Sequence, residues 1–319
     1  MPEHPRLDAR PTLDARKFRD PAVTAGGERR AAVALGGLAT LWFNTGTLCN
    51  LTCQNCYIES SPRNDRLAYL TTDEVARYLD EIERDGLGTR LIGFTGGEPF
   101  MNPALPDMLE LALGRGFEAL VLTNAMRPMR KVRDRLLALR AYGDALTIRV
   151  SVDHYSPPVH ERERGARSWA PTIDGLRWLA QQGFRLHVAG RRFTDEPEEA
   201  MRAGFARLFA ELGVPIDARD AVALTLFPEM DATADVPEIT EACWGILGKS
   251  PADVMCASSR MVVRRRDAAS AAVVACTLLP YDPAFELGAT LRDAAGDVKL
   301  NHPHCAKFCV LGGAACGPG

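Results

Sequence analysis

Three closely spaced cysteines carry the clearest chemical signal in this chain. Cys49, Cys53 and Cys56 stand at C-x3-C-x2-C spacing in a short polar loop, directly after the apolar run 41–43. Thiolates hold iron–sulfur clusters, and this spacing lets one loop wrap one cluster. Three thiolates on a four-iron cluster leave one iron open to a substrate or a cofactor. Zinc is the alternative, but zinc sites usually take four protein ligands in paired C-x2-C halves.

A glycine-rich motif after the next apolar run argues against zinc. Gly96, Gly97 and Glu98 directly follow the residues 91–94, which we expect to form a strand. The cysteine loop after one strand and this Gly-Gly-Glu-Pro motif after the next resemble the radical S-adenosylmethionine (SAM) superfamily. The resemblance implies that SAM binds the open iron and that Gly96, Gly97 and Glu98 form the site for its amino group. It also implies that an electron from the cluster cleaves SAM into methionine and a 5′-deoxyadenosyl radical.

Polar residues after two further expected strands extend this SAM site. The resemblance implies that Asn124, Ser151 and Asp153 contact the ribose or the methionine part of SAM. Arg164 lies in a run of alternating charges and has two open interpretations. By likeness to members with a C-terminal cluster domain it pairs with the SAM carboxylate, and otherwise it is a surface arginine.

Six of the nine cysteines follow residue 240 and indicate a second metal centre: Cys243, Cys256, Cys276, Cys305, Cys309 and Cys316. With an expected hairpin at 261–265 and 271–275, they resemble the twitch domain, a shortened relative of the SPASM extension that carries one auxiliary four-iron cluster. We favour as its ligands Cys276, Cys305, Cys309 and Cys316. Cys256 then remains as a catalytic candidate that gives a hydrogen atom to a substrate radical. The rival ligand set contains Cys256 in place of Cys316.

Apolar runs that alternate with amphipathic segments predict an α/β fold. The expected strands are 39–44, 90–94, 119–123, 146–152, 185–189 and 221–227, and the expected helices are 71–84, 106–113, 131–139, 172–181 and 197–212. Strands alternating with helices predict parallel β/α units, and six such strands fit a partial (β/α)6 radical SAM barrel. Its chemistry belongs at the carboxyl ends of the strands. We divide the chain into a lead-in (1–38), the barrel (39–240) and a small auxiliary iron–sulfur domain (241–319).

Composition limits the classes of partner. The chain has 319 residues, 46% of them hydrophobic, and a net charge of −3, so it carries no electrostatic footprint for nucleic acid. No apolar stretch reaches the length of a membrane span, and the N-terminus lacks the pattern of a signal peptide. Nine cysteines in such a chain suggest metal ligands in a reducing cytoplasm rather than disulfides.

Two classes of reaction compete for the function. The twitch-like domain and the spare thiols resemble aminoglycoside-tailoring members of the neomycin C epimerase type. We therefore expect epimerisation of a sugar carbon in a small polar substrate, with a flavodoxin or ferredoxin as electron donor. Dehydrogenation of a sugar or aminocyclitol alcohol and peptide modification by a maturase are the alternatives. Maturases commonly carry an N-terminal recognition domain and a full SPASM extension, for which residues 1–38 are too short and the cysteines too few.

Overall fold

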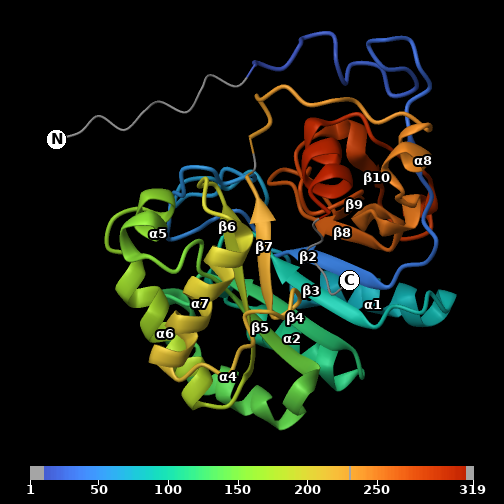
Figure 1. The fold of residues 1–319 in the computed structure, drawn as a ribbon. Helices are drawn as coiled ribbons and strands as arrows, with labels where there is room; N and C mark the ends of the chain where they lie inside the picture. The colour runs from blue at the N-terminus through green and yellow to red at the C-terminus, as the bar shows by residue number, and fades with distance from the viewer. Residues whose placement is uncertain (1–10, 230, 314–319) are drawn as a thin grey trace.

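A central nine-stranded sheet, built on the six parallel strands of a partial barrel, organises the fold (Figure 1). The computed structural model describes residues 11–229 and 231–313. The barrel strands, in both chain and spatial order, are β2 (Thr40–Asn44), β3 (Leu91–Thr95), β4 (Glu118–Thr123), β5 (Leu146–Ser151), β6 (Arg185–Arg192) and β7 (Leu224–Pro228). Each corresponds to an expected strand. The architecture confirms the predicted α/β fold and its partial (β/α)6 barrel.

The first barrel helix begins at a complete capping box, as predicted. In α1 (Thr72–Asp85) the Thr71 hydroxyl accepts the N–H of Glu74 over 3.2 Å, and the Glu74 carboxylate accepts the N–H of Thr71 over 2.9 Å. Gly86 ends the helix in the left-handed conformation (φ 60°) that glycine adopts without strain. The apolar face of α1, including Val75 and Leu79, is buried against the sheet.

The remaining barrel helices differ from expectation at two places. They are α2 (Leu105–Gly114), α3 (Arg127–Lys131), α4 (Arg133–Ala138), α5 (Pro157–Arg164), α6 (Trp169–Gln181) and α7 (Glu198–Leu212). The expected helix 131–139 is present in shorter form as α4, because the backbone at Val132 (φ −113°) leaves the helical range and separates it from α3, which was not expected. Helix α5 was not expected, since its charged sequence has no apolar periodicity. No helix in the described ranges is long and apolar enough to cross a membrane.

The C-terminal region continues the barrel sheet. The expected hairpin is present as β8 (Ser259–Val263) antiparallel to β9 (Ala272–Val274), followed by β10 (Glu286–Gly288). Strand β8 also pairs in parallel with β2, so the full order is β10-β9-β8-β2-β3-β4-β5-β6-β7. Further elements of this region are the short helix α8 (Cys243–Leu247), the strand β11 (Val298–Lys299) and the π-helical segment Cys305–Leu311.

The sheet separates two hydrophobic cores. In β2, Leu41 and Phe43 pack with the barrel helices, whereas Trp42 between them packs with residues of the C-terminal region. This alternation follows from the two-residue period of side chains along a strand. The core that contains Trp42 therefore joins the barrel to the C-terminal cysteines.

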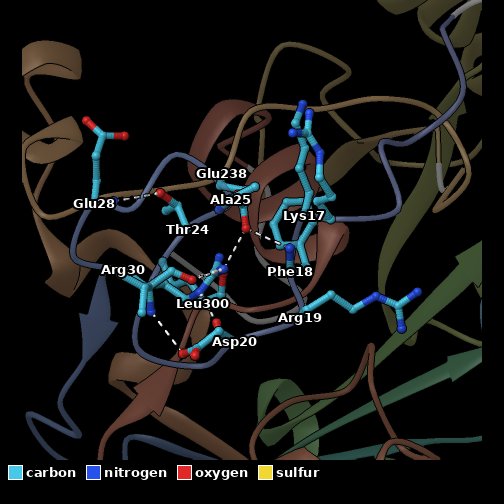
Figure 2. Close-up of polar contacts among 12 residues, drawn as sticks. Lys17, Phe18, Arg19, Asp20, Thr24, Ala25, Glu28, Arg30, Glu238 and Leu300 are labelled. Atoms are coloured by element: carbon cyan, nitrogen blue, oxygen red, sulfur yellow. Dashed lines mark hydrogen bonds and ion pairs between the residues drawn. The ribbon is translucent and has the colours of Figure 1, made fainter.

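The N-terminal segment lies along the C-terminal region rather than the barrel helices (Figure 1). Its strand β1 (Ala32–Val33) pairs with β11, and a buried ion pair joins Arg30 to Glu238 over 2.5 Å. Glu238 also accepts the backbone N–H groups of Phe18 and Ala25, each over 2.6 Å (Figure 2). One carboxylate thus fixes two turns of the segment, and the expected lead-in is an ordered strap in its described part.

Candidate active site

The three loop cysteines line one cavity at the carboxyl end of the parallel strands. Cys49 is buried, and Cys53 and Cys56 are half-buried. The N–H of Leu51 donates to Cys49 Sγ over 3.4 Å, and the N–H of Ser60 donates to Cys56 Sγ over 3.3 Å. Backbone donors favour the charged form of a sulfur, and the charged thiolate is the form that binds metal.

Burial disfavours the charged form of two of the loop thiols. Burial, followed by the charge of Glu98, raises the pKa of Cys49 to about 12, and burial also raises the pKa of Cys53. These thiols therefore keep their protons until a metal displaces them. Within the described residues, no three His, Cys, Asp or Glu side chains are placed to hold a single metal ion. Three thiols on one short loop that line a single cavity supply the kind and number of ligands of a four-iron cluster with one open iron, so the donor set fits the expected cluster.

A buried hydroxyl in the same cavity also indicates a ligand. Ser60 is 4% exposed and lines the cavity, and its Oγ has no hydrogen-bond partner in the described structure. Buried polar groups are normally hydrogen-bonded. The cavity thus offers soft sulfur donors and an unused polar group, as a site for a cluster with a polar cofactor requires.

The two glycines of the Gly-Gly-Glu motif let the turn after β3 pack under the cysteine loop. Gly96 has φ 142°, and a Cβ on it would lie 2.5 Å from the carbonyl oxygen of Gly46. A Cβ on Gly97 would lie 2.3 Å from the carbonyl oxygen of Leu48. Both glycines line the cavity. Their absence of side chains therefore serves loop packing as well as the close approach to a ligand expected from the sequence.

Glu98 lies behind the cavity wall. It is 2% exposed and is not among the residues that line the cavity. Its carboxylate accepts the Thr123 hydroxyl over 2.7 Å, the Asn124 N–H over 2.8 Å and the Phe100 N–H over 3.2 Å. Burial raises its pKa, against the opposing effect of these donors. In this structure the carboxylate ties the end of β3 to the end of β4, and the backbone of the two glycines faces the cavity in its place.

Asp153 and Arg164 form a buried ion pair in the cavity. Arg164 Nε donates to Asp153 Oδ2 over 3.0 Å, and Arg164 Nη2 donates to Oδ1 over 3.1 Å. Burial alone would raise the pKa of Asp153, but the charges of Arg164 and Arg191 outweigh it and lower that pKa. Asn124 and Ser151 line the same cavity. Arg164 is therefore a cavity residue and not a surface arginine.

Two residues that the sequence did not single out hold the cysteine loop. Glu163, on α5, accepts the Asn55 side-chain amide over 2.9 Å and, through its backbone carbonyl, the Gln54 N–H over 2.8 Å. Arg191, on β6, donates to the Asn55 carbonyl over 3.0 Å and lies 3.9 Å from the Glu163 carboxylate. Both were missed because α5 was not expected and β6 was expected to end at 189. The sequence did offer one signal for Arg191, which is a charged residue near the carboxyl end of a parallel strand.

The wall shared with the C-terminal region is apolar. It consists of Phe227 from β7, Leu278, and Phe308 from the π-helical segment. The rings of Phe227 and Phe308 stack with their centroids 5.4 Å apart. The C-terminal region thus closes the cavity with hydrophobic side chains.

A second, smaller cavity gathers four cysteines of the C-terminal region. Leu278, which lines both cavities, lies between them. His304 lines the second cavity and is 6% exposed, and burial lowers its pKa to about 4, so it is neutral at pH 7. The cysteines that line this cavity are Cys256, Cys276, Cys305 and Cys309.

This placement matches the rival ligand set and disagrees with the expected role of Cys256. Cys256 is 5% exposed, its pKa is raised to about 11 by burial, and it does not line the first cavity. The charges of Cys276 and Cys256 reach Cys305 and contribute, after burial, to its raised pKa. A thiol among three others and behind Leu278 is poorly placed to reach a substrate in the first cavity. Cys316, our expected fourth ligand, lies outside the described residues.

Comparison with known proteins identifies the family. The family model of the Radical SAM superfamily matches residues 43–203, a range that contains both the cysteine loop and the Gly-Gly-Glu motif. The chain therefore belongs to the radical SAM superfamily, as the sequence motifs predicted. Membership identifies it as a radical SAM enzyme and implies SAM and a [4Fe–4S] cluster as cofactors.

Individual relatives are similar over part of the chain. The antilisterial bacteriocin subtilosin biosynthesis protein AlbA of Bacillus subtilis is 32% identical over 142 residues, which is 44% of this chain and 30% of AlbA. The mycofactocin maturase MftC of Mycobacterium ulcerans is 29% identical over 136 residues, 43% of this chain and 35% of MftC. Streptococcus suis SuiB bound to S-adenosylmethionine shares the fold with a TM-score of 0.57 at 12% identity, over 80% of this chain and 64% of SuiB. The chain spans about a third of the length of the two curated relatives.

Proposed function

We propose that this chain is a radical SAM enzyme that modifies a peptide, with one auxiliary four-iron cluster beside its active site. The observation that carries the proposal is the apolar wall that the first cavity shares with the C-terminal region. Phe227, Leu278 and Phe308 suit an apolar side chain of a peptide better than a sugar, whose hydroxyl groups need hydrogen-bond partners. Relatives named for bacteriocin biosynthesis and for mycofactocin maturation point the same way.

The sugar epimerase that we expected from the sequence has less support. Its hydrogen donor, Cys256, lies in the second cavity. The one carboxylate that lines the first cavity, among the described residues, is Asp153, and it is paired with Arg164. Three acidic residues follow β7, and each contacts another side chain. Glu229 contacts Lys307, Asp231 contacts Thr233, and Asp235 contacts Lys17. An amino sugar would therefore find no free acidic partner there.

The residues of the first cavity have different proposed roles in binding the cofactors and the substrate. SAM and the cluster, when bound, supply the one-electron chemistry that removes a hydrogen atom from the substrate. Cys49, Cys53 and Cys56 would hold the cluster, and the turn at 96–97 lines the same cavity. Asp153 and Arg164 offer one charge of each sign to the charged groups of SAM. The apolar wall excludes water from the reacting atoms.

We assign the four cysteines of the second cavity, Cys256, Cys276, Cys305 and Cys309, to the auxiliary cluster. Because Leu278 lines both cavities, a cluster held by these cysteines would lie behind this side chain and would supply or accept electrons rather than bind the substrate. A flavodoxin or ferredoxin remains our choice of electron donor for the enzyme.

Iron content tests the cluster assignment. Anaerobically reconstituted wild type should hold about eight irons, and the triple Cys49/Cys53/Cys56→Ala variant about four. Cys256→Ala should lose the auxiliary signal in electron paramagnetic resonance, whereas Cys316→Ala should keep it. The reverse result for these two single variants would restore the ligand set that contains Cys316, and four irons in wild type would remove the auxiliary cluster.

Substrate class is tested by mass spectrometry. The reconstituted enzyme, with SAM and dithionite, is incubated with a pool of synthetic peptides rich in apolar side chains and, separately, with a panel of aminoglycosides. We expect a SAM-dependent change of mass in the peptide pool, weaker in Phe308→Ala because the apolar wall is truncated. Conversion of an aminoglycoside with no change in any peptide would overturn the peptide proposal.

A further inference from the structure

A strongly basic surface lies on the two short helices that follow β4. Residues 127–135, which span α3 and the start of α4, contain five arginine or lysine side chains and one aspartate, in a chain whose net charge is −3. All five cations are exposed. A surface with this much charge of one sign attracts a partner of the opposite sign. We call these five side chains the basic surface, and they are Arg127, Arg130, Lys131, Arg133 and Arg135.

Neighbouring carboxylates neutralise only part of the basic surface. Among the described residues, no carboxylate forms an ion pair with Arg127 or Lys131. The other three cations have acidic neighbours in ion pairs that are exposed to solvent, and exposed pairs are weak. These pairs are Arg130 with Asp174, Arg133 with Asp134, and Arg135 with Asp107.

The basic surface begins beside the cysteine loop. Met126, which directly precedes Arg127, accepts the side-chain N–H of Asn50 at its Sδ over 3.6 Å. Asn50 is the next residue after Cys49, and its amide oxygen accepts the side-chain N–H of Asn124 over 2.9 Å. Helix α3 therefore starts at the carboxyl end of β4, next to the loop whose cysteines would hold the SAM-binding cluster.

The cysteine loop also reaches the surface of the molecule. Thr52 and Gln54, on either side of Cys53, are exposed, and Cys53 itself is half-buried. Cleavage of SAM consumes one electron, which must come from outside the chain. Electron transfer through protein slows steeply with distance, so a donor has to dock close to this loop. The basic surface is the strongly charged feature beside it.

We propose that the basic surface is the docking site of a small acidic redox protein that carries a reduced flavin or iron–sulfur group. The inference rests on the proposed function for the class of the electron donor, and it does not depend on the substrate being a peptide. In the docked complex the donor loses one electron, which passes to the cluster at the cysteine loop, and no bond forms or breaks in this step. Opposite charges on the two proteins steer them together and set their orientation.

Calorimetric titration of the reconstituted holoenzyme with a purified flavodoxin, and in parallel with a purified ferredoxin, tests the docking site. The variant Arg127→Glu/Lys131→Glu reverses the two cations of the basic surface that have no ion-pair partner among the described residues. The matched control is Arg140→Glu/Arg219→Glu, which makes the same change in net charge. Its two arginines are also exposed, but they precede β5 and β7 and therefore lie at the opposite end of the barrel.

The expected result is a loss of binding that is specific to the basic surface and to charge. At low ionic strength, Arg127→Glu/Lys131→Glu should bind the better of the two donors at least about tenfold more weakly than wild type. The control variant should stay close to wild type. The difference should shrink at about 1 M salt, where the screening length is about 3 Å.

Reduction kinetics provide a second measurement. The rate of SAM cleavage with the protein donor is divided by the rate with dithionite, a small reductant that needs no docking site. This ratio should fall in Arg127→Glu/Lys131→Glu and not in Arg140→Glu/Arg219→Glu. Because it compares two reductants for the same protein, the ratio does not depend on how well a variant is loaded with iron.

Three outcomes would overturn the inference. Equal affinity of wild type and Arg127→Glu/Lys131→Glu for the donor would show that the donor docks elsewhere. Failure of wild type to bind either donor, while dithionite still supports SAM cleavage, would show that the basic surface has no such partner. Tighter binding of an RNA oligonucleotide than of either donor, lost in the same variant, would assign the surface to nucleic acid. Intact donor docking without any change in a peptide would instead count against the proposed function alone.

Discussion

At the scale of single residues, the cysteine loop depends on side chains that never touch a cysteine. Glu163 is 4% exposed and accepts the Asn55 amide, and Arg191 lies beside it. Glu163→Ala leaves buried donors without an acceptor, a cost of about 1–3 kcal/mol. We expect chelator-driven loss of iron from this loop to become about tenfold faster, because the loop opens more often.

The auxiliary cluster and a surface variant control this experiment. Glu199→Ala changes an exposed glutamate of α7 and should leave both rates of iron loss unchanged. Equal rates for the loop cluster in Glu163→Ala and wild type would show that the loop does not need this anchor.

At the scale of elements, the N-terminal strap is fixed by one buried pair. The side chains of Arg30 and Glu238 are 0% and 6% exposed. Glu238→Ala removes the acceptor of three donors and leaves the charge of Arg30 buried without a counter-charge, so the free energy of unfolding should fall by about 3–5 kcal/mol. Denaturant unfolding measures the loss, and limited proteolysis should cut first within residues 11–30.

The neighbouring exposed pair offers a matched control for the strap. The side chains of Arg29 and Glu241 are 81% and 47% exposed. Glu241→Ala should cost at most about 1 kcal/mol, because exposed ion pairs contribute little. Similar losses for Glu238→Ala and Glu241→Ala would show that burial of the first pair does not matter.

Helix α1 gives a smaller prediction at the same scale. Thr71→Ala removes the hydroxyl that accepts the Glu74 N–H and should lower the free energy of unfolding by about 1 kcal/mol. Thr72→Ala, one residue further along and inside the helix, should change stability little. An equal loss in the two variants would contradict the capping role.

At the scale of the whole molecule, stability should depend on a buried histidine. His160 is 0% exposed, neither ring nitrogen has a partner in the described structure, and burial followed by the charge of Arg164 lowers its pKa to about 4. An unfolded histidine has a pKa of about 6.5, so between these values the unfolded chain binds more protons. Stability of the metal-free protein should therefore fall as pH drops from about 6.5 towards 4, by up to about 1.4 kcal/mol per pH unit for this group.

Denaturant unfolding at pH 7 and at pH 5 measures this dependence. His160→Phe keeps an aromatic ring beside Trp169, whose ring centroid lies 5.4 Å from that of His160. The variant should lose less stability than wild type between the two pH values. An identical loss in both proteins would assign the pH dependence to other groups.

Much of the barrel was predictable because its signals are local. Most of the barrel strands contain an apolar run, and Thr71 and Glu74 are close enough in sequence to define a cap by themselves. Local signals failed where the tertiary structure supplied the stabilisation. Strand β7 begins at Leu224 instead of 221, because the Asp220 carboxylate accepts the N–H groups of Val222 and Ala223 in a turn.

The cysteine loop and the Gly-Gly-Glu motif determined the superfamily by sequence alone, since three ligands and a tight turn each lie within a few residues. Which of the remaining cysteines lie together depended on the tertiary structure. Cys256 and Cys305 are distant in sequence, and it is the parallel pairing of β8 with β2 that carries the C-terminal region over the barrel mouth. Only that packing put Cys256 beside the other three cysteines of the second cavity and Leu278 between the two cavities, because contacts between distant segments depend on the order in which the strands pair.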